Sequence, residues 1–125
     1  MTGQKDNSQR LQEVLGELVA HNPDIISALV VSDDGLNVAS GIPYPGDDDL
    51  ALAASDLADM AENFSNRLEQ GTLNRILLEG ERRTTIVIRA SRHTILMVSV
   101  PADAKLGLVM QSIRRAGKEI ALIFQ

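Results

Sequence analysis

Three segments with the character of strands follow one another with only short turns between them, and this pattern constrains the fold more than any other feature. Strands joined by such short turns are antiparallel neighbours in one sheet, because a parallel connection needs a crossover of about a dozen residues or more. The sequence therefore predicts a three-stranded antiparallel unit in the second half of the chain. Its expected strands are Leu73–Glu79, Thr84–Arg89 and Thr94–Val100.

A hairpin precedes this unit. The apolar run Ile25–Val31 and the alternating run Leu36–Ser40 flank the turn Asp33-Asp34-Gly35. Asp-Gly between two such runs is a strong hairpin signal, because glycine accepts the positive φ that the turn requires. Together the two units predict one five-stranded antiparallel sheet.

Three amphipathic helices complete the pattern. Asn7 or Ser8 is the expected N-cap of the first helix. The second helix spans Leu50–Gln70 without glycine or proline, with Gly71 as its expected C-cap. The third begins near Asp103, which is able to cap it. The order α-β-β-α-β-β-β-α predicts an α+β fold with helices on the faces of the sheet.

The chain has 125 residues, of which 44% are hydrophobic, and this suits one domain with a packed core. We expect residues 8–125 to form that domain and the polar residues 1–7 to be a flexible N-terminus. Residues 1–7 contain no apolar signal segment, no apolar run elsewhere is long enough to cross a bilayer, and cysteine is absent. These features favour a cytoplasmic protein without membrane insertion.

Composition and motifs exclude several classes of function. The formal net charge of −5 and the aromatic share of 2% disfavour phosphate contacts and base stacking, so we expect no nucleic-acid partner. The sequence has no phosphate-binding loop ending in Gly-Lys-Ser/Thr, no Gly-x-Gly-x-x-Gly after a strand and no Gly-x-Ser-x-Gly elbow. We therefore expect a non-enzymatic protein that holds no cofactor and no metal and neither binds nor hydrolyses GTP alone.

A few residues could still form an enzyme site. His93 would be the base, with Asp47, Asp48 or Glu79 as acids. Neither His93 nor His21 has a second ligand at metal spacing, so both are interpreted as solvent-facing turn residues. The run Asp47–Asp49 lacks the alternate spacing of a calcium loop and instead suits the positive end of a helix dipole.

The long second helix has an apolar arc wider than packing on one sheet requires. With Leu57 at the centre of the sheet-facing stripe, Met60 lies well off that stripe. We interpret the excess as an interface with a second copy of the chain, which would also cover the expected edge strand. A wide arc tucked under the Gly41–Gly46 loop is the alternative. The predicted dimer interface comprises Leu57, Met60, Ala61, Phe64, Arg75 and Leu77.

Several of these features occur together in one known family. Ala28–Ser32 runs directly into Asp33-Asp34-Gly35-Leu36, and an alanine-rich helix follows a Gly/Pro loop. The last helix carries Leu-Gly-x-x-x-x-x-Ile-Arg-x-Ala from Leu106 to Ala116. In this combination residues 8–124 resemble the roadblock/dynein light-chain family. The chain is most similar to bacterial members of the conservon type, which are encoded beside a small Ras-like GTPase.

The resemblance implies an architecture and a role. Its members carry the long helix on one face of the sheet and the two terminal helices on the other, as in profilin-like folds. They form homodimers by pairing their third strands and long helices. The implied function is a cytoplasmic adaptor or regulator of a small Ras-like GTPase in a bacterial signalling complex. Some members accelerate hydrolysis by their GTPase, and a histidine-kinase-like protein is a further expected partner. Such a complex could place the chain peripherally at the membrane.

The exposed polar side of the long helix is the predicted docking face for the GTPase, because acidic residues there complement a basic rim. A rival docking surface is the basic set Arg82, Arg83 and Arg114. The alternative function is a small-molecule sensor with a pocket between sheet and helix, which the apolar inward positions disfavour. The predicted partner-binding residues are Asp49, Asp56, Asp59, Glu62, Asn63 and Arg67.

Overall fold

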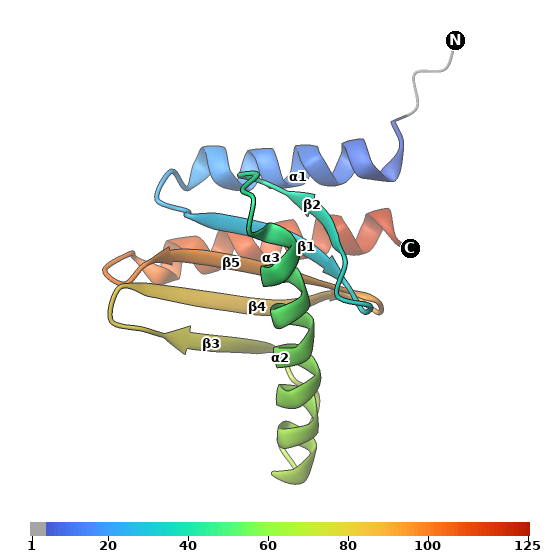
Figure 1. Ribbon diagram of the computed structural model, residues 1–125, viewed down its shortest axis with the longest axis vertical. Coiled ribbons are helices and arrows are strands. Elements are labelled where there is room, and N and C mark those ends of the chain that lie inside the picture. The colour runs from blue at the N-terminus through green and yellow to red at the C-terminus, as the bar shows by residue number, and fades with distance from the viewer. Residues whose placement is uncertain (1–4) are drawn as a thin grey trace.

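Five antiparallel strands and three helices make up the computed structural model, which describes residues 5–125 (Figure 1). The sheet has the order β2-β1-β5-β4-β3, so β2 and β3 form its two edges. This arrangement confirms the predicted α+β fold and its order of elements. The elements are α1 (Asn7–His21), β1 (Ser27–Ser32), β2 (Asn37–Ser40), α2 (Asp47–Arg67), β3 (Arg75–Glu79), β4 (Arg83–Ser91), β5 (Thr94–Pro101) and α3 (Leu106–Ile123).

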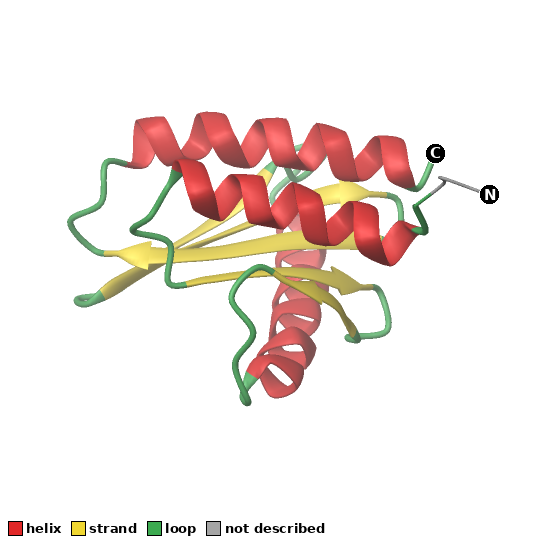
Figure 2. Ribbon diagram, turned by 90° about the horizontal axis from the view of Figure 1, so that it is seen from above, coloured by secondary structure: helices red, strands yellow, loops and turns green. Residues whose placement is uncertain are grey.

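The helices cover both faces of the sheet, with α1 and α3 side by side on one face and α2 on the other (Figure 2). Alternation along β1 shows how the sequence divides between the two layers. Ala28 and Val30 join the core under α1 and α3, whereas Leu29 and Val31 join the core under α2. Successive side chains of a strand point to opposite faces, so one strand supplies both cores.

The ends of the terminal helices differ from the predictions. Asp6 is the N-cap of α1, not Asn7 or Ser8: its carboxylate accepts the Gln9 N–H at 2.8 Å, and the Gln9 side chain accepts the Asp6 N–H. This reciprocal capping box satisfies backbone N–H groups at the start of α1, which includes Asn7. Residues 1–4 lie outside the described residues. Lys105, rather than Asp103, is the N-cap residue of α3.

Helix α2 is displaced toward the N-terminus relative to the prediction. It begins at Asp47, whose buried carboxylate accepts the Tyr44 N–H at 3.0 Å. It ends at Arg67, and Gly71 is not its C-cap. The chain turns away through Glu69 at a φ of 56°, two residues before Gly71 at a φ of 84°. A non-glycine residue in the left-handed region therefore ends the helix earlier than the glycine signal indicated.

The side of α2 that packs on the sheet is made of small residues. Ala51, Ala54 and Ala58 are buried against Leu29, Val31 and Met97. The stripe centred on Leu57 was predicted to face the sheet, and that prediction is wrong: Leu57 is half-buried, and Phe64 is 64% exposed. Small side chains allow close approach of the helix axis to the sheet, and the large apolar residues lie to one side of this contact.

The hairpin turn beneath α2 explains why small residues are required. Gly35 has a φ of 80°, and a Cβ built on it would lie 2.8 Å from Leu52 Cδ1 and 3.3 Å from Leu52 Cα. The Ser55 hydroxyl donates to the Asp33 carbonyl at 3.1 Å, which fixes the helix to the same turn. The turn therefore serves both as the hairpin connection and as the support of α2.

Replacing Gly35 by alanine is expected to lower the free energy of unfolding by about 2–4 kcal/mol, because backbone strain and the contact with Leu52 add. The matched control is Gly71→Ala, at a φ of 84° with no atom within 4 Å of the new Cβ, which should cost about 1–2 kcal/mol. Urea unfolding measures both changes. Equal losses would contradict the close approach of α2 to the turn.

Candidate functional site

One flank of α2 presents a row of large apolar side chains to solvent. Met60 is 70% exposed, Phe64 64% and Leu68 52%. Leu57 and Ala61 are half-buried beside them. Residues three and four apart share one side of a helix, so these side chains form a continuous apolar stripe. A stripe of this kind is typical of a surface that packs on another protein.

This stripe extends past the sheet because α2 is longer than the sheet is wide. At about 1.5 Å per residue, the 21 residues of α2 extend about 31 Å. Five strands about 4.8 Å apart span only about 19 Å between the outermost strand axes. Figure 1 shows α2 crossing the strands and continuing beyond β3. The end of the helix that carries Phe64 therefore projects beyond the edge of the molecule's own sheet.

Strand β3 forms the edge under this overhang. Its outer side has no neighbouring strand in the described part of the chain. Leu77 is 44% exposed and Leu78 47% exposed. In the sheet, Arg75 pairs with Ile88 and Leu77 pairs with Ile86. Ile86 and Ile88 contribute to the core under α1 and α3. The side chains of Arg75 and Leu77 therefore lie on the face away from α2.

The structure thus brings together four of the six predicted interface residues. Leu57, Met60, Ala61 and Phe64 share the flank of α2, whereas the side chains of Arg75 and Leu77 lie on the opposite face of β3. Leu68 and Leu78, which the prediction does not include, are also exposed large apolar residues. Leu78 pairs with Thr85. Thr85 is two residues before Val87, which belongs to the core under α2, so Thr85 and Leu78 lie on the same face as Val87. The alternation of side chains along a strand shows which residues of β3 share a face. It does not show which face is turned toward α2 until the register of β3 against β4 is known.

The predicted docking residues of α2 fall into two groups. Asp49, Asp56 and Asp59 are exposed. Asn63 and Arg67 are also exposed but engage one another, with Arg67 Nε donating to Asn63 Oδ1 at 3.0 Å. Glu62 was expected to remain available after folding, and that expectation is wrong. It is half-buried and forms an ion pair with Arg89 of β4.

Arg89 is the centre of a charged network on the α2 face. Its Nη1 donates to Asp33 Oδ1 at 3.1 Å and its Nη2 to Glu62. His93 Nδ1 donates to Asp33 Oδ2 at 2.6 Å. Partial burial disfavours the charged guanidinium, but the hydrogen bonds and charges of Glu62 and Asp33 outweigh it and raise the pKa of Arg89. The network joins α2, the first hairpin turn and the β4–β5 turn.

The residues considered for an enzyme site do not converge. Asp47 lines the same groove as Arg83, the first residue of β4, and Glu79 ends β3 beside that end of β4. His93 lies past the other end of β4. The carboxylate of Asp47 also accepts a hydrogen bond from the Tyr44 N–H. Among residues 5–125 no group of three or more His, Asp or Glu side chains is arranged to hold a metal ion.

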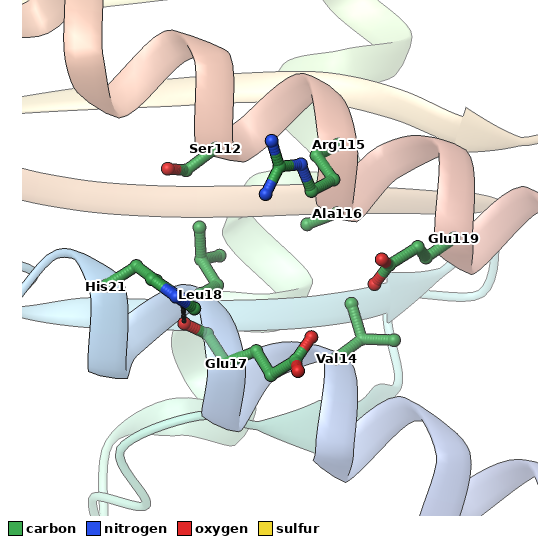
Figure 3. Close-up of a pocket in the computed structure, with 8 residues that line it drawn as sticks. All are labelled: Val14, Glu17, Leu18, His21, Ser112, Arg115, Ala116 and Glu119. Atoms are coloured by element: carbon green, nitrogen blue, oxygen red, sulfur yellow. Dashed lines mark hydrogen bonds between the residues drawn. The ribbon is translucent and has the colours of Figure 1, made fainter.

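His21 lies at a cleft of about 40 Å³ between α1 and α3. Figure 3 shows Glu17 and His21 on α1 opposite Arg115 and Glu119 on α3. His21 Nδ1 donates to the Glu17 carbonyl at 2.8 Å, which satisfies an end carbonyl of α1. The role of His21 is therefore to close a helix.

A larger groove of about 580 Å³ lies at the beginning of α2. Ile26 and Ser27 line one side, Leu50 and Ala53 another, and Tyr44 and Arg83 also contribute. Its lining comes from α2 and from Ser27 of β1 and Arg83 of β4, so it lies between helix and sheet, where the sensor alternative placed its pocket. Within residues 5–125, no helix combines the length and the apolar character needed to cross a membrane.

Comparison with known proteins decides the family. The model of the Roadblock/LC7 domain matches residues 11–99. The chain belongs to the Roadblock/LC7 family. This confirms the resemblance inferred from the order of elements, while the narrower conservon type stays a prediction.

Relatives of this Roadblock/LC7 chain occur in archaea and bacteria. The uncharacterized protein MJ1340 of Methanocaldococcus jannaschii is 34% identical over 101 residues, 80% of this chain and 88% of that protein. A structure described as MglB with tetrameric arrangement has a TM-score of 0.85 at 24% identity, over 96% of this chain and 91% of the other. The gliding protein MglB of Thermus thermophilus has a TM-score of 0.84 at 24% identity, over 96% and 92%.

The predicted likeness to profilin is also confirmed at the level of the fold. Profilin II of Acanthamoeba castellanii has a TM-score of 0.63 at 13% identity, over 92% of this chain and 98% of the other. This identity is low, so the likeness concerns the arrangement of sheet and helices alone.

The Arg89–Glu62 pair is expected to contribute about 0.5–1 kcal/mol of coupling in a double-mutant cycle with Arg89→Met and Glu62→Gln. The matched control is the pair Lys5–Glu13, which is closer to solvent: its side chains are 58% and 52% exposed, against 29% and 43% for Arg89 and Glu62. Lys5→Met with Glu13→Gln should show coupling near zero. Urea unfolding at low and high salt measures both cycles, and equal coupling would contradict a structural role of the network.

Proposed function

We propose that this chain is a homodimeric, non-enzymatic adaptor that binds and regulates a small Ras-like GTPase. The observation that carries the proposal is the apolar overhang of α2 beyond β3. An exposed stripe with Met60 and Phe64 beside an unpaired strand edge combines two features that proteins normally cover.

A two-fold arrangement would cover both features at once. Pairing of β3 with its copy satisfies the backbone groups of both edges, and the overhanging end of each α2 then lies over the partner's sheet. There the stripes of the two helices pack against each other. Isologous contact of this kind is the commonest form of homodimer. The tetrameric arrangement described for MglB supports self-association by a chain of this fold.

The GTPase is assigned to the exposed acidic side of the paired helices. Asp49, Asp56 and Asp59 are exposed. Asp56 lies one turn before Met60, so the acidic side borders the apolar stripe and its carboxylates form the rim of the dimer contact. Carboxylates there would steer a partner with a basic rim and provide specificity. The residues of the rival basic surface lie in two separate places: Arg82 and Arg83 are at the start of β4, and Arg114 is on α3. A histidine-kinase-like partner stays a prediction.

The sensor alternative rests on the groove of about 580 Å³ beside α2. Tyr44 and Arg83 give it an aromatic and a charged group, which small-molecule sites commonly combine with an apolar lining. A ligand that binds there should raise the melting temperature of wild type and not of Arg83→Ala. The adaptor remains the preferred function because a ligand in this groove would leave Met60, Phe64 and the edge of β3 uncovered.

Replacing Met60 or Phe64 by glutamate is expected to convert a dimer into a monomer, with a dimer Kd at least about 100-fold weaker, because an unpaired charge would be buried at the contact. Sedimentation velocity at tens of micromolar, on the order of common in-vitro concentrations, measures the state. Asn66→Glu is the matched control on the exposed side of the same helix and should remain dimeric. A monomeric wild type at that concentration would exclude the interface.

The docking face is tested with a small P-loop GTPase in its GDP and GTP-analogue forms, chosen by inspection of the genes that neighbour the gene for this chain. Asp56→Lys with Asp59→Lys should weaken binding by at least about tenfold while the dimer persists. Arg82→Glu with Arg83→Glu is the matched charge reversal and should have little effect. If the arginine pair alone matters in a titration, the docking face has been misassigned. The rate of GTP hydrolysis with and without this chain distinguishes an activator from a scaffold.

A further inference from the structure

A second groove lies on the face opposite the α2 stripe, between α3 and the β3–β4 pair. Its volume is about 340 Å³. Ile88 of β4 and Met110 and Ala121 of α3 provide apolar lining. Arg75, Arg114 and Lys118 also line it. Arg89 also contributes to the lining, but its guanidinium is paired with Asp33 and Glu62. The groove therefore combines an apolar surface with three further cations.

The groove exists because α3 lies close to β4 and leaves β3 uncovered. A Cβ built on Gly117 would lie 2.8 Å from Ile88 Cδ1, so the helix axis approaches the sheet at this point. Leu77, on the same face of β3, is 44% exposed. The wall of α3 and the uncovered strand thus form a concave surface that continues to the sheet edge.

The three cations have no intramolecular partner among the described residues. Arg75, Arg114 and Lys118 are exposed, and no carboxylate of residues 5–125 lies within 4 Å of their charged nitrogens. The chain as a whole carries a net charge of −5. A local concentration of unpaired cations in an acidic protein favours an anionic ligand at this place.

We propose that this groove binds an acidic amphipathic segment of a second protein. Its apolar side chains would lie on Ile88, Met110 and Leu77, and its carboxylates would pair with Arg75, Arg114 and Lys118. A bilayer is flat and would meet only the rim of a concave groove, and an anionic membrane would repel the acidic remainder of the chain. The groove is on the opposite face from α2, so both surfaces can be occupied together.

The test uses a fluorescein-labelled synthetic peptide with leucine at i, i+3, i+4 and i+7 and glutamate at the remaining positions. A peptide of the same composition in scrambled order is the control probe. Fluorescence anisotropy should show saturable binding of the amphipathic peptide to wild type that weakens as salt is added. The scrambled peptide should bind at least about fivefold more weakly, because it cannot place its leucines on one side.

Arg114→Glu with Lys118→Glu should weaken peptide binding by at least about tenfold, because two attractive charges become repulsive. Arg115→Glu with Arg82→Glu is the matched control: it has the same change in net charge, but Arg115 lines the α1–α3 cleft and Arg82 precedes β4. Leu77→Asp tests the apolar part of the groove. Circular dichroism and thermal unfolding verify that each variant is folded.

Three results would overturn the proposal. The first is no saturable binding at about 0.5 mM protein, the weak limit for a specific contact. The second is an equal loss in the two charge-reversed pairs. The third is binding to vesicles of phosphatidylcholine and phosphatidylserine, lost in Arg114→Glu with Lys118→Glu, without binding of the peptide. Met60→Glu should leave peptide binding unchanged, so a failure of the dimer is distinguishable from a failure of this groove.

Discussion

The close contact between α2 and the first hairpin turn is the constraint on which the rest of the structure depends. Gly35 leaves no room for a side chain under Leu52, and Ser55 bonds to the carbonyl of Asp33. A helix held this close to a sheet can place only alanine and serine beneath it. The large apolar residues of α2 are therefore displaced to its flank, and the exposed stripe is a consequence of how the hairpin supports the helix.

The sequence was sufficient for the elements and for the family, because strands and helices follow from local spacing. It failed on the orientation of α2. The prediction centres the sheet-facing stripe on Leu57 because large apolar residues usually form cores, whereas alanines of α2 fill this one. The charged network could not be predicted either, since Arg89 meets Glu62 and Asp33 only after folding. The predicted interface residues of α2 do share one flank of the helix. The face to which Arg75 and Leu77 point is set by the register of β3 against β4, and both side chains lie on the face away from α2.

The two faces of the sheet differ in chemistry. The α2 face combines an apolar stripe with exposed carboxylates, and the α3 face carries a groove lined by unpaired cations. This separation arises because α2 and α3 cover opposite faces of the sheet, so the side chains of each helix stay on one side of the molecule. The chain thereby presents two surfaces of different chemistry on opposite faces of one sheet.

Because α2 is longer than the sheet is wide, the helical order of its last turns is linked to the concentration of a binding partner. The turns beyond β3 have little tertiary packing from their own chain, and an isolated helical segment of this length is marginal in water. Whatever covers Met60 and Phe64 therefore contributes to holding those turns in helical form. By mass action, the amide protection of these turns becomes a measure of how much partner is present. In the proposed dimer, the protection of this end of α2 would therefore report on assembly, whereas the buried Ala51 and Ala54 are covered by the chain's own sheet.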